Sequence, residues 1–156
     1  MNVAIAPAKR PDELGQVRDL FVEYANGLGV DLCFQHFAEE LAALPGKYAP
    51  PLGNLWLAAV DGQPAGCVAV RPLEPSIAEL KRLYVRPVYR RLKLGRQLTE
   101  VALAFARSAG YSCIRLDTLP SMTSAQALYW SLGFEMIEPY CANPISGATY
   151  WEKRFA

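Results

Sequence analysis

Apolar residues recur along the chain at spacings that predict alternating strands and helices. Residues 2–6 form a short apolar run typical of a strand. A helix is predicted for residues 12–28, and a second for residues 34–44, where Leu44-Pro45-Gly46 ends it. The first helix is predicted from apolar residues at helical spacing, namely Leu14, Val17, Leu20, Phe21 and Tyr24.

The middle of the chain predicts a hairpin followed by a strand and a long helix. Residues 54–60 and 65–71 are apolar strands joined by Asp61-Gly62, a strong signal for an antiparallel hairpin. Residues 79–85 form the next strand, and a basic loop leads from it into a helix over residues 95–109. We expect that helix to bury one stripe, made of Leu98, Val101, Ala102, Phe105 and Ala109.

The last third of the chain predicts one buried strand, one helix and two closing strands. These cover residues 112–118, 121–132, 134–137 and 149–154. The order indicates a mixed sheet flanked by helices, an α/β or α+β fold. No repeat or linker interrupts the 156 residues, so a single domain over residues 1–156 is expected. With 52% hydrophobic and 20% charged residues, the chain is globular.

Several classes of protein are disfavoured by this sequence. The longest apolar stretches are too short for a transmembrane helix, and the first residues lack the pattern of a secretory signal, so a cytoplasmic protein without a membrane partner is expected. The only histidine is His36, and the cysteines are far apart, so no metal site is expected. We expect reduced and mostly buried thiols at Cys33, Cys67, Cys113 and Cys141.

The basic residues are concentrated in one segment. The net charge is +1, yet seven of the sixteen lysines and arginines lie between Lys81 and Arg96, together with none of the acidic residues. This segment runs from a strand through a loop into a helix that begins near Gly95. The amides and the positive dipole end of that helix add to the charge of the loop. A phosphorylated ligand is therefore expected at residues 90–96, whereas Lys81 and Arg82 precede the turn and are read as solvated charges on the strand.

Two motifs in this region resemble those of the GNAT superfamily of N-acetyltransferases. Arg90-Arg91-Leu92-Lys93-Leu94-Gly95 is similar to its acyl-CoA-binding motif, and Leu83-Tyr84-Val85-Arg86-Pro87 is similar to the strand before it. Ala125 to Phe134, which ends in Leu-Gly-Phe, resembles the family helix that carries a tyrosine. Lys93 stands where the family usually has its first glycine, and Met122 where many members have asparagine. If Lys93 takes a positive φ, the strain costs about 1 kcal/mol, so either the backbone there is ordinary or the lysine charge offsets the strain, and we favour the second.

The resemblance implies a mixed, mostly antiparallel central sheet with helices on both faces, and acetyl-CoA as co-substrate without a metal. A substrate amine would attack the thioester directly, with no covalent enzyme intermediate. A backbone N–H near Tyr84 or Val85 would stabilise the oxyanion. The residues that the resemblance assigns to acetyl-CoA are Leu83, Tyr84 and Val85, through their backbones, and Arg90, Arg91, Lys93, Leu94, Gly95 and Arg96, which would hold its phosphates.

Glu79 and Tyr129 are the candidate catalytic residues. Glu79 begins the strand before the turn and matches a position where many relatives have a carboxylate, so it is the candidate base; an ion pair with Lys81 or Arg82 on the surface is the alternative. Tyr129 lies in the second motif and is the candidate acid, with core packing as the alternative.

The acceptor is predicted to be a small-molecule amine, and the sequence does not select one. The resemblance suggests Tyr24, Tyr140 and Asn143 as acceptor contacts, and it leaves a homodimer open. Two other functions compete with catalysis. The departures at Lys93 and Met122 are compatible with a non-catalytic acyl-CoA-binding regulatory module. Nucleic-acid binding through the basic segment is disfavoured, because the rest of the chain is acidic.

Overall fold

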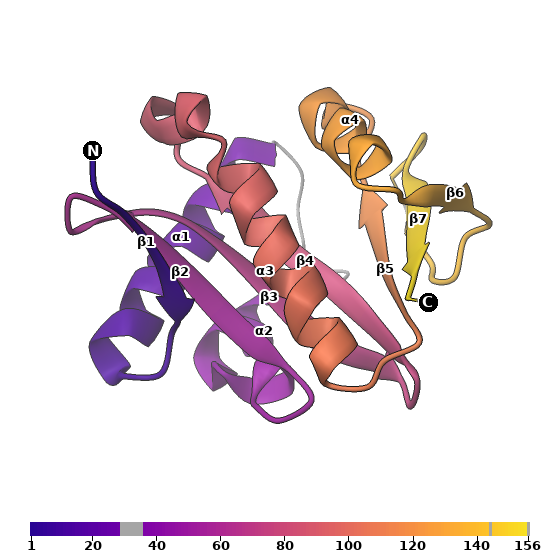
Figure 1. The fold of residues 1–156 in the computed structure, drawn as a ribbon, viewed down its shortest axis with the longest axis horizontal. Helices are drawn as coiled ribbons and strands as arrows, with labels where there is room; N and C mark the ends of the chain where they lie inside the picture. The colour runs from indigo at the N-terminus through magenta and orange to yellow at the C-terminus, as the bar shows by residue number, and fades with distance from the viewer. Residues whose placement is uncertain (29–35, 144, 156) are drawn as a thin grey trace.

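In the computed structural model of the chain, which describes residues 1–28, 36–143 and 145–155, the strands form one sheet (Figure 1). It has seven strands in the described residues, in the order β1-β2-β3-β4-β5-β7-β6. All neighbours pair antiparallel except β4 and β5. The strands are β1 (Val3–Pro7), β2 (Asn54–Val60), β3 (Gln63–Glu74), β4 (Ile77–Val85), β5 (Cys113–Thr118), β6 (Glu135–Ile137) and β7 (Thr149–Arg154).

Helices cover both faces of the sheet. The helical segments are α1 (Pro11–Leu28), α2 (Phe37–Ala43), α3 (Leu94–Ser108) and α4 (Thr123–Ser131), with the 3-10 turns η2 (Gly46–Tyr48) and η3 (Pro87–Leu92). In Figure 1, α3 and α4 lie on one face, and α1 and α2 lie on the other. Successive side chains of β2 point to opposite faces of the sheet and so join both hydrophobic cores. Trp56 packs in the core under α3, and Leu55 packs in the core under α1.

The predicted mixed, mostly antiparallel fold is confirmed, with local differences. The expected basic loop contains the turn η3, and α3 ends one residue before Ala109. Ala109 is therefore exposed, and Ala106, one turn after Ala102, is buried in its place. The second helix begins at Phe37, and the first residues of the span predicted for it lie outside the described residues. None of the described helices is long and apolar enough to cross a membrane.

The pairing of β4 with β5 is short. Three residue pairs join the strands, from Ile77 with Cys113 to Glu79 with Arg115. Beyond them the strands diverge toward the end of the molecule where η3 and α4 lie (Figure 1). On its other side, β4 has a register shift against β3 opposite Arg82, whose φ is +60°. Such a bulge bends a strand and increases its twist, and here it lies just past the last β4–β5 pair.

The side chain of Arg82 is buried at this bulge, so the expectation that it is solvated is wrong. Its Nε and Nη2 donate to the two carboxylate oxygens of Glu40, at 2.9 and 3.0 Å. The Arg82 and Glu40 side chains are 2% and 17% exposed, and the guanidinium also lies 5.1 Å from the ring centre of Phe37. This pair fixes α2 to the bulge of β4.

We expect Glu40→Ala to lower the free energy of unfolding by about 3 kcal/mol, because it takes a bidentate partner from a buried guanidinium. Glu39→Ala is the matched control. Its side chain is 81% exposed and lies 3.7 Å from His36, so its change should stay within about 0.5 kcal/mol. Urea denaturation of both variants measures the difference. Equal small losses would show that the Arg82–Glu40 pair does not stabilise the fold.

Candidate active site

A small pocket occupies the gap between the diverging strands. Its volume is about 50 Å³. Tyr24 lines it from α1 and Tyr129 lines it from α4, although these helices cover opposite faces of the sheet. The gap is therefore reached from both faces. The remaining lining residues come from β4, β5 and the start of α4, namely Leu80, Lys81, Arg82, Leu83, Leu116, Asp117, Met122 and Ala125.

A larger pocket of about 480 Å³ lies on the face that carries α2. Residues of α2, η2, β3, β4, β5 and the segment after β6 line it. The described part of its lining carries both signs of charge, with the acids Glu39, Glu40, Glu79 and Asp117 and the bases Lys47, Arg71, Lys81 and Arg82. Of the described residues, three line both pockets, namely Lys81, Arg82 and Asp117.

Glu79 lies at the wall of the larger pocket and is 2% exposed. Nε of Arg71 donates to its Oε1 at 2.8 Å, and the Tyr140 hydroxyl donates to its Oε2 at 2.7 Å. Glu79 is therefore not at the surface, and the ion pair expected as the alternative to a base role is present with Arg71 as its partner. Arg71 on the neighbouring strand neutralises this carboxylate.

Tyr140 and Asn143 line neither pocket. The Asn143 side-chain amide donates to Oδ2 of Asp117 at 3.2 Å, as Tyr140 donates to Glu79. Each of the two residues thus orients a carboxylate on an adjacent strand. Their predicted role as direct acceptor contacts stays a prediction.

Tyrosines surround the smaller pocket. Tyr129 is 4% exposed, and burial, helped by the charges of Tyr24 and Asp117, raises the pKa of its phenol. Burial likewise raises the pKa of Tyr24 to about 12. Tyr24, expected at the acceptor, therefore lies beside Tyr129 in the gap. Both phenols stay protonated at neutral pH and can donate a proton or a hydrogen bond.

The basic segment divides into two parts. On β4 and just after it, Arg82 pairs with Glu40 of α2, and Arg86 pairs with Glu23 of α1 at 2.6 Å. In the turn that follows, Arg90 donates to the Val85 carbonyl oxygen at 3.0 Å, while its charge remains exposed. The positive charge available to a ligand is therefore concentrated in the turn and not on the strand.

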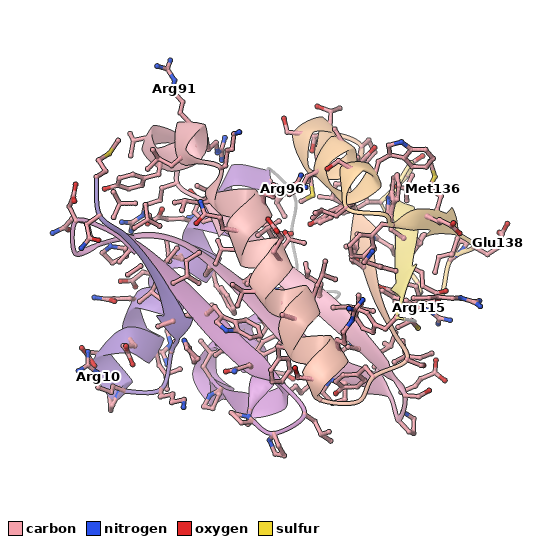
Figure 2. All side chains as sticks on the ribbon, in the orientation of Figure 1. Arg10, Arg91, Arg96, Arg115, Met136 and Glu138 are labelled. Atoms are coloured by element: carbon pink, nitrogen blue, oxygen red, sulfur yellow. The ribbon has the colours of Figure 1, made fainter. Side chains whose placement is uncertain are left out.

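The arginines of the turn reach in different directions. Figure 2 shows Arg91 extending outward from η3, and Arg96 in the space between α3 and α4. Nη1 of Arg96 donates to the Ser131 hydroxyl of α4 at 3.2 Å, and its Nε lies 3.4 Å from Glu100.

The N-terminus of α3 is open to an anion. Lys93 precedes the helix in the left-handed conformation, with φ +58°, and the helix has no side-chain cap. The sequence motif therefore keeps the backbone that glycine usually supplies, as expected for this position. At Gly95 an added Cβ would meet only Leu128 of α4, at 3.8 Å, so the fold leaves room beside this first helical turn. Leu94 is buried and anchors the turn to the core.

Leu83, Tyr84 and Val85 lie on β4 beyond its last pair with β5, where the edge of β4 toward β5 has no strand partner among the described residues, and Leu83 lines the smaller pocket. Within the described residues, β5 pairs with β4 only as far as Glu79. Backbone groups on that edge can therefore bond a ligand that carries amides, in the manner of an added strand.

Arg71 and Asp117 are two of the pocket residues that the sequence did not predict. Arg71 follows an apolar strand and carries no motif. For Asp117, the alternation of residues 113–118 places Arg115 and Asp117 on one face of the strand, and that was the signal available. Of the cysteines, Cys67 and Cys113 are buried as expected, but Cys141 is exposed, because it lies in the segment between β6 and β7. Cys33 lies outside the described residues.

Comparison with known proteins agrees with this geometry. Residues 16–134 match the model of the acetyltransferase (GNAT) family. An uncharacterised N-acetyltransferase of Schizosaccharomyces pombe is 42% identical over 151 residues, which cover 96% of this chain and 93% of that protein. The chain therefore belongs to the GNAT family of acetyltransferases.

Solved structures share the fold. An acetyltransferase from Streptococcus agalactiae superposes with a TM-score of 0.81 at 23% identity, over 98% of both chains. The PaiA N-acetyltransferase from Thermoplasma acidophilum, solved in complex with coenzyme A, superposes with a TM-score of 0.76 at 17% identity, over 99% of this chain and 100% of that one.

Two substitutions at Lys93 separate its strain from its charge. Lys93→Gly should raise the free energy of unfolding by up to about 1 kcal/mol, because glycine adopts positive φ without a steric cost. Lys93→Ala keeps the strain and should bring no such gain. If the ammonium contacts a phosphate, both variants should bind acetyl-CoA about tenfold more weakly, as measured by calorimetry. Unchanged affinity in both would show that the Lys93 ammonium makes no contact with the ligand.

Proposed function

We propose that the protein is an acetyl-CoA-dependent N-acetyltransferase that acetylates the amine of a small molecule by direct attack, without a covalent enzyme intermediate. One observation carries the proposal: the gap between β4 and β5, which Tyr129 lines, adjoins the larger charged pocket, and three residues line both. A donor in the gap and an acceptor in the larger pocket would meet at those residues. Membership of the family and the CoA complex of the Thermoplasma acidophilum structure support this choice of donor.

The residues around the gap fit acetyl-CoA. Leu83, Tyr84 and Val85 offer backbone groups on the open edge of β4 for the amides of the pantetheine arm. The open N-terminus of α3 suits a phosphate. The side chains and amides that would hold the phosphates are those of Arg90, Arg91, Lys93, Leu94, Gly95 and Arg96.

When bound, the donor supplies an activated acetyl carbonyl and a thiolate leaving group. A backbone N–H of β4 near Tyr84 or Val85 would stabilise negative charge on the carbonyl oxygen. Tyr129 would protonate the sulfur, since burial keeps its phenol protonated. The proton of the acceptor ammonium would go to a carboxylate of the larger pocket, and Glu79 is the one that the sequence predicted.

Two measurements on the purified chain test the proposal. Calorimetric titration should show micromolar binding of acetyl-CoA, and ATP serves as the comparison ligand. A thiol-detection assay over a panel of small amines should then show CoA release that depends on the amine. Tight binding of acetyl-CoA without CoA release across the panel would favour the non-catalytic acyl-CoA-binding module. Absence of acetyl-CoA binding would refute both functions.

Tyr129→Phe should lower kcat by about a hundredfold, because it removes the acid that protonates the leaving sulfur. The affinity for acetyl-CoA should stay the same, since the ring and its contact with Phe134 are preserved. Tyr111→Phe is the matched control: it is also a buried tyrosine, and its hydroxyl donates to the Leu52 carbonyl oxygen, away from both pockets. The control should keep its kcat. Wild-type turnover by Tyr129→Phe would remove Tyr129 from the mechanism.

A further inference from the structure

Among the acidic residues that the structure describes, Asp117 alone lines both pockets. It lies on β5, two residues beyond the last residue paired with β4, and it lines both pockets. Glu39, Glu40 and Glu79 line the larger pocket alone. A group that acts on an acceptor nitrogen as it reaches the donor must lie where the two pockets meet. By position, Asp117 is the carboxylate that meets this condition.

The other three carboxylates are engaged or remote. Both oxygens of Glu40 accept hydrogen bonds from Arg82. Both oxygens of Glu79 accept hydrogen bonds, one from a guanidinium. Glu39 is 81% exposed. The carboxylate oxygens of Glu40 and Glu79 are thus occupied by fixed donors, whereas an acceptor ammonium needs a carboxylate oxygen that it can reach.

Asp117 is held differently. Among the described residues, a single hydrogen bond reaches its side chain, from the neutral amide of Asn143 to Oδ2. This bond orients the carboxylate without neutralising it, and Oδ1 remains available to a ligand. The charge of Asp117 also reaches the phenol of Tyr129, where it adds to burial in raising the pKa of that group. The proposed acid and Asp117 therefore border the same small space.

We infer that Asp117, rather than Glu79, binds the acceptor ammonium at the junction of the two pockets and accepts its proton. This assignment rests on the proposed acetyltransferase function. Asn143 then acts as a positioning residue for Asp117, and Arg71 and Tyr140 hold Glu79 as a fixed part of the wall.

The step balances in protons and electrons. An N–H bond of the ammonium breaks, and the proton passes to the Asp117 carboxylate, which leaves a lone pair on the nitrogen. That pair forms the new C–N bond to the acetyl carbon while the C–S bond breaks and its electrons stay on sulfur. Tyr129 gives its proton to the sulfur and receives the second nitrogen proton. Asp117 releases its proton to water, so the products are the amide, the CoA thiol and one proton.

Several charged or titratable groups surround Asp117 and influence the pH dependence of this step. Lys81 lines both pockets with Asp117, and burial lowers the pKa of its ammonium, although the charges of Glu79 and Asp117 act in the other direction. The groups that face or act on Asp117 come from every neighbouring element: Lys81 and Arg82 from β4, Tyr24 from α1, Tyr129 from α4, Tyr140 and Cys141 from the segment after β6, and Tyr150 from β7.

The test compares Asp117→Asn with Glu79→Gln, using the best amine of the panel. At pH 7 the acceptor is an ammonium, so Asp117→Asn should lower kcat/KM by about a hundredfold or more. As the pH approaches the pKa of the amine, the acceptor loses its proton to water and the defect should shrink. Acetyl-CoA affinity should stay at the wild-type value, which reports an intact fold. Calorimetry with CoA bound should show weaker amine binding to Asp117→Asn.

A merely structural role would give the same defect at every pH, and that result would overturn the assignment. Recovery at high pH in Glu79→Gln but not in Asp117→Asn would return the role to Glu79. Asp117→Glu is the second variant: it keeps a carboxylate and should retain more activity than Asp117→Asn at pH 7. If wild type releases no CoA with any amine, the proposed function fails and the assignment with it. Wild-type turnover with an unimpaired Asp117→Asn refutes the assignment alone.

Discussion

In the described residues, β4 and β5 are the parallel neighbours of an otherwise antiparallel sheet, and their pairing lasts for three residue pairs. Their separation creates the gap that both helical layers reach. The bulge at Arg82 directs β4 away from β5, and it is stabilised by the pair of Arg82 with Glu40. A residue at positive φ inside a strand carries a steric cost, which the surrounding contacts must offset. The pair of Arg82 with Glu40 thus joins α2 to β4 at the point where the strands separate, beside the pocket.

A row of alternating charges crosses the sheet just before the strands separate. Arg71, Glu79, Arg115 and Glu152 lie in register on β3, β4, β5 and β7. Nε of Arg115 donates to Glu152 at 2.7 Å, as Arg71 does to Glu79. Burial raises the pKa of Glu152, but the hydrogen bonds from Arg115 and Arg154 outweigh it, so the pKa lies below its usual value. Opposite charges on neighbouring strands stabilise the sheet at the point where pairing is about to end.

The sequence predicted what local patterns determine. Three features depend on residues close in the chain: the Asp61-Gly62 hairpin, the buried stripe of α3 and the turn before Gly95. The structure has each of them at its predicted position, except that Ala109 is not part of the stripe. The contact of Tyr140 with Glu79 could not be predicted in this way, because the two residues are 61 positions apart. The prediction of a solvated Arg82 was wrong for the same reason, since its partner Glu40 is 42 residues away. Burial of a charge depends on tertiary contacts that a charge pattern alone does not contain.

The same reasoning explains why the basic segment is divided. Charges on β4 lie under α1 and α2, where an unpaired guanidinium would be costly, so Arg82 and Arg86 are matched by Glu40 and Glu23 from those helices. Lys93 and its neighbours in the turn lie at the surface, where water solvates a charge that has no acidic partner. Positive charge can therefore accumulate there without destabilising the fold. The fold therefore tolerates an anion-binding surface at the turn, where water solvates the charges. It does not tolerate unpaired charge on β4, which the helices cover.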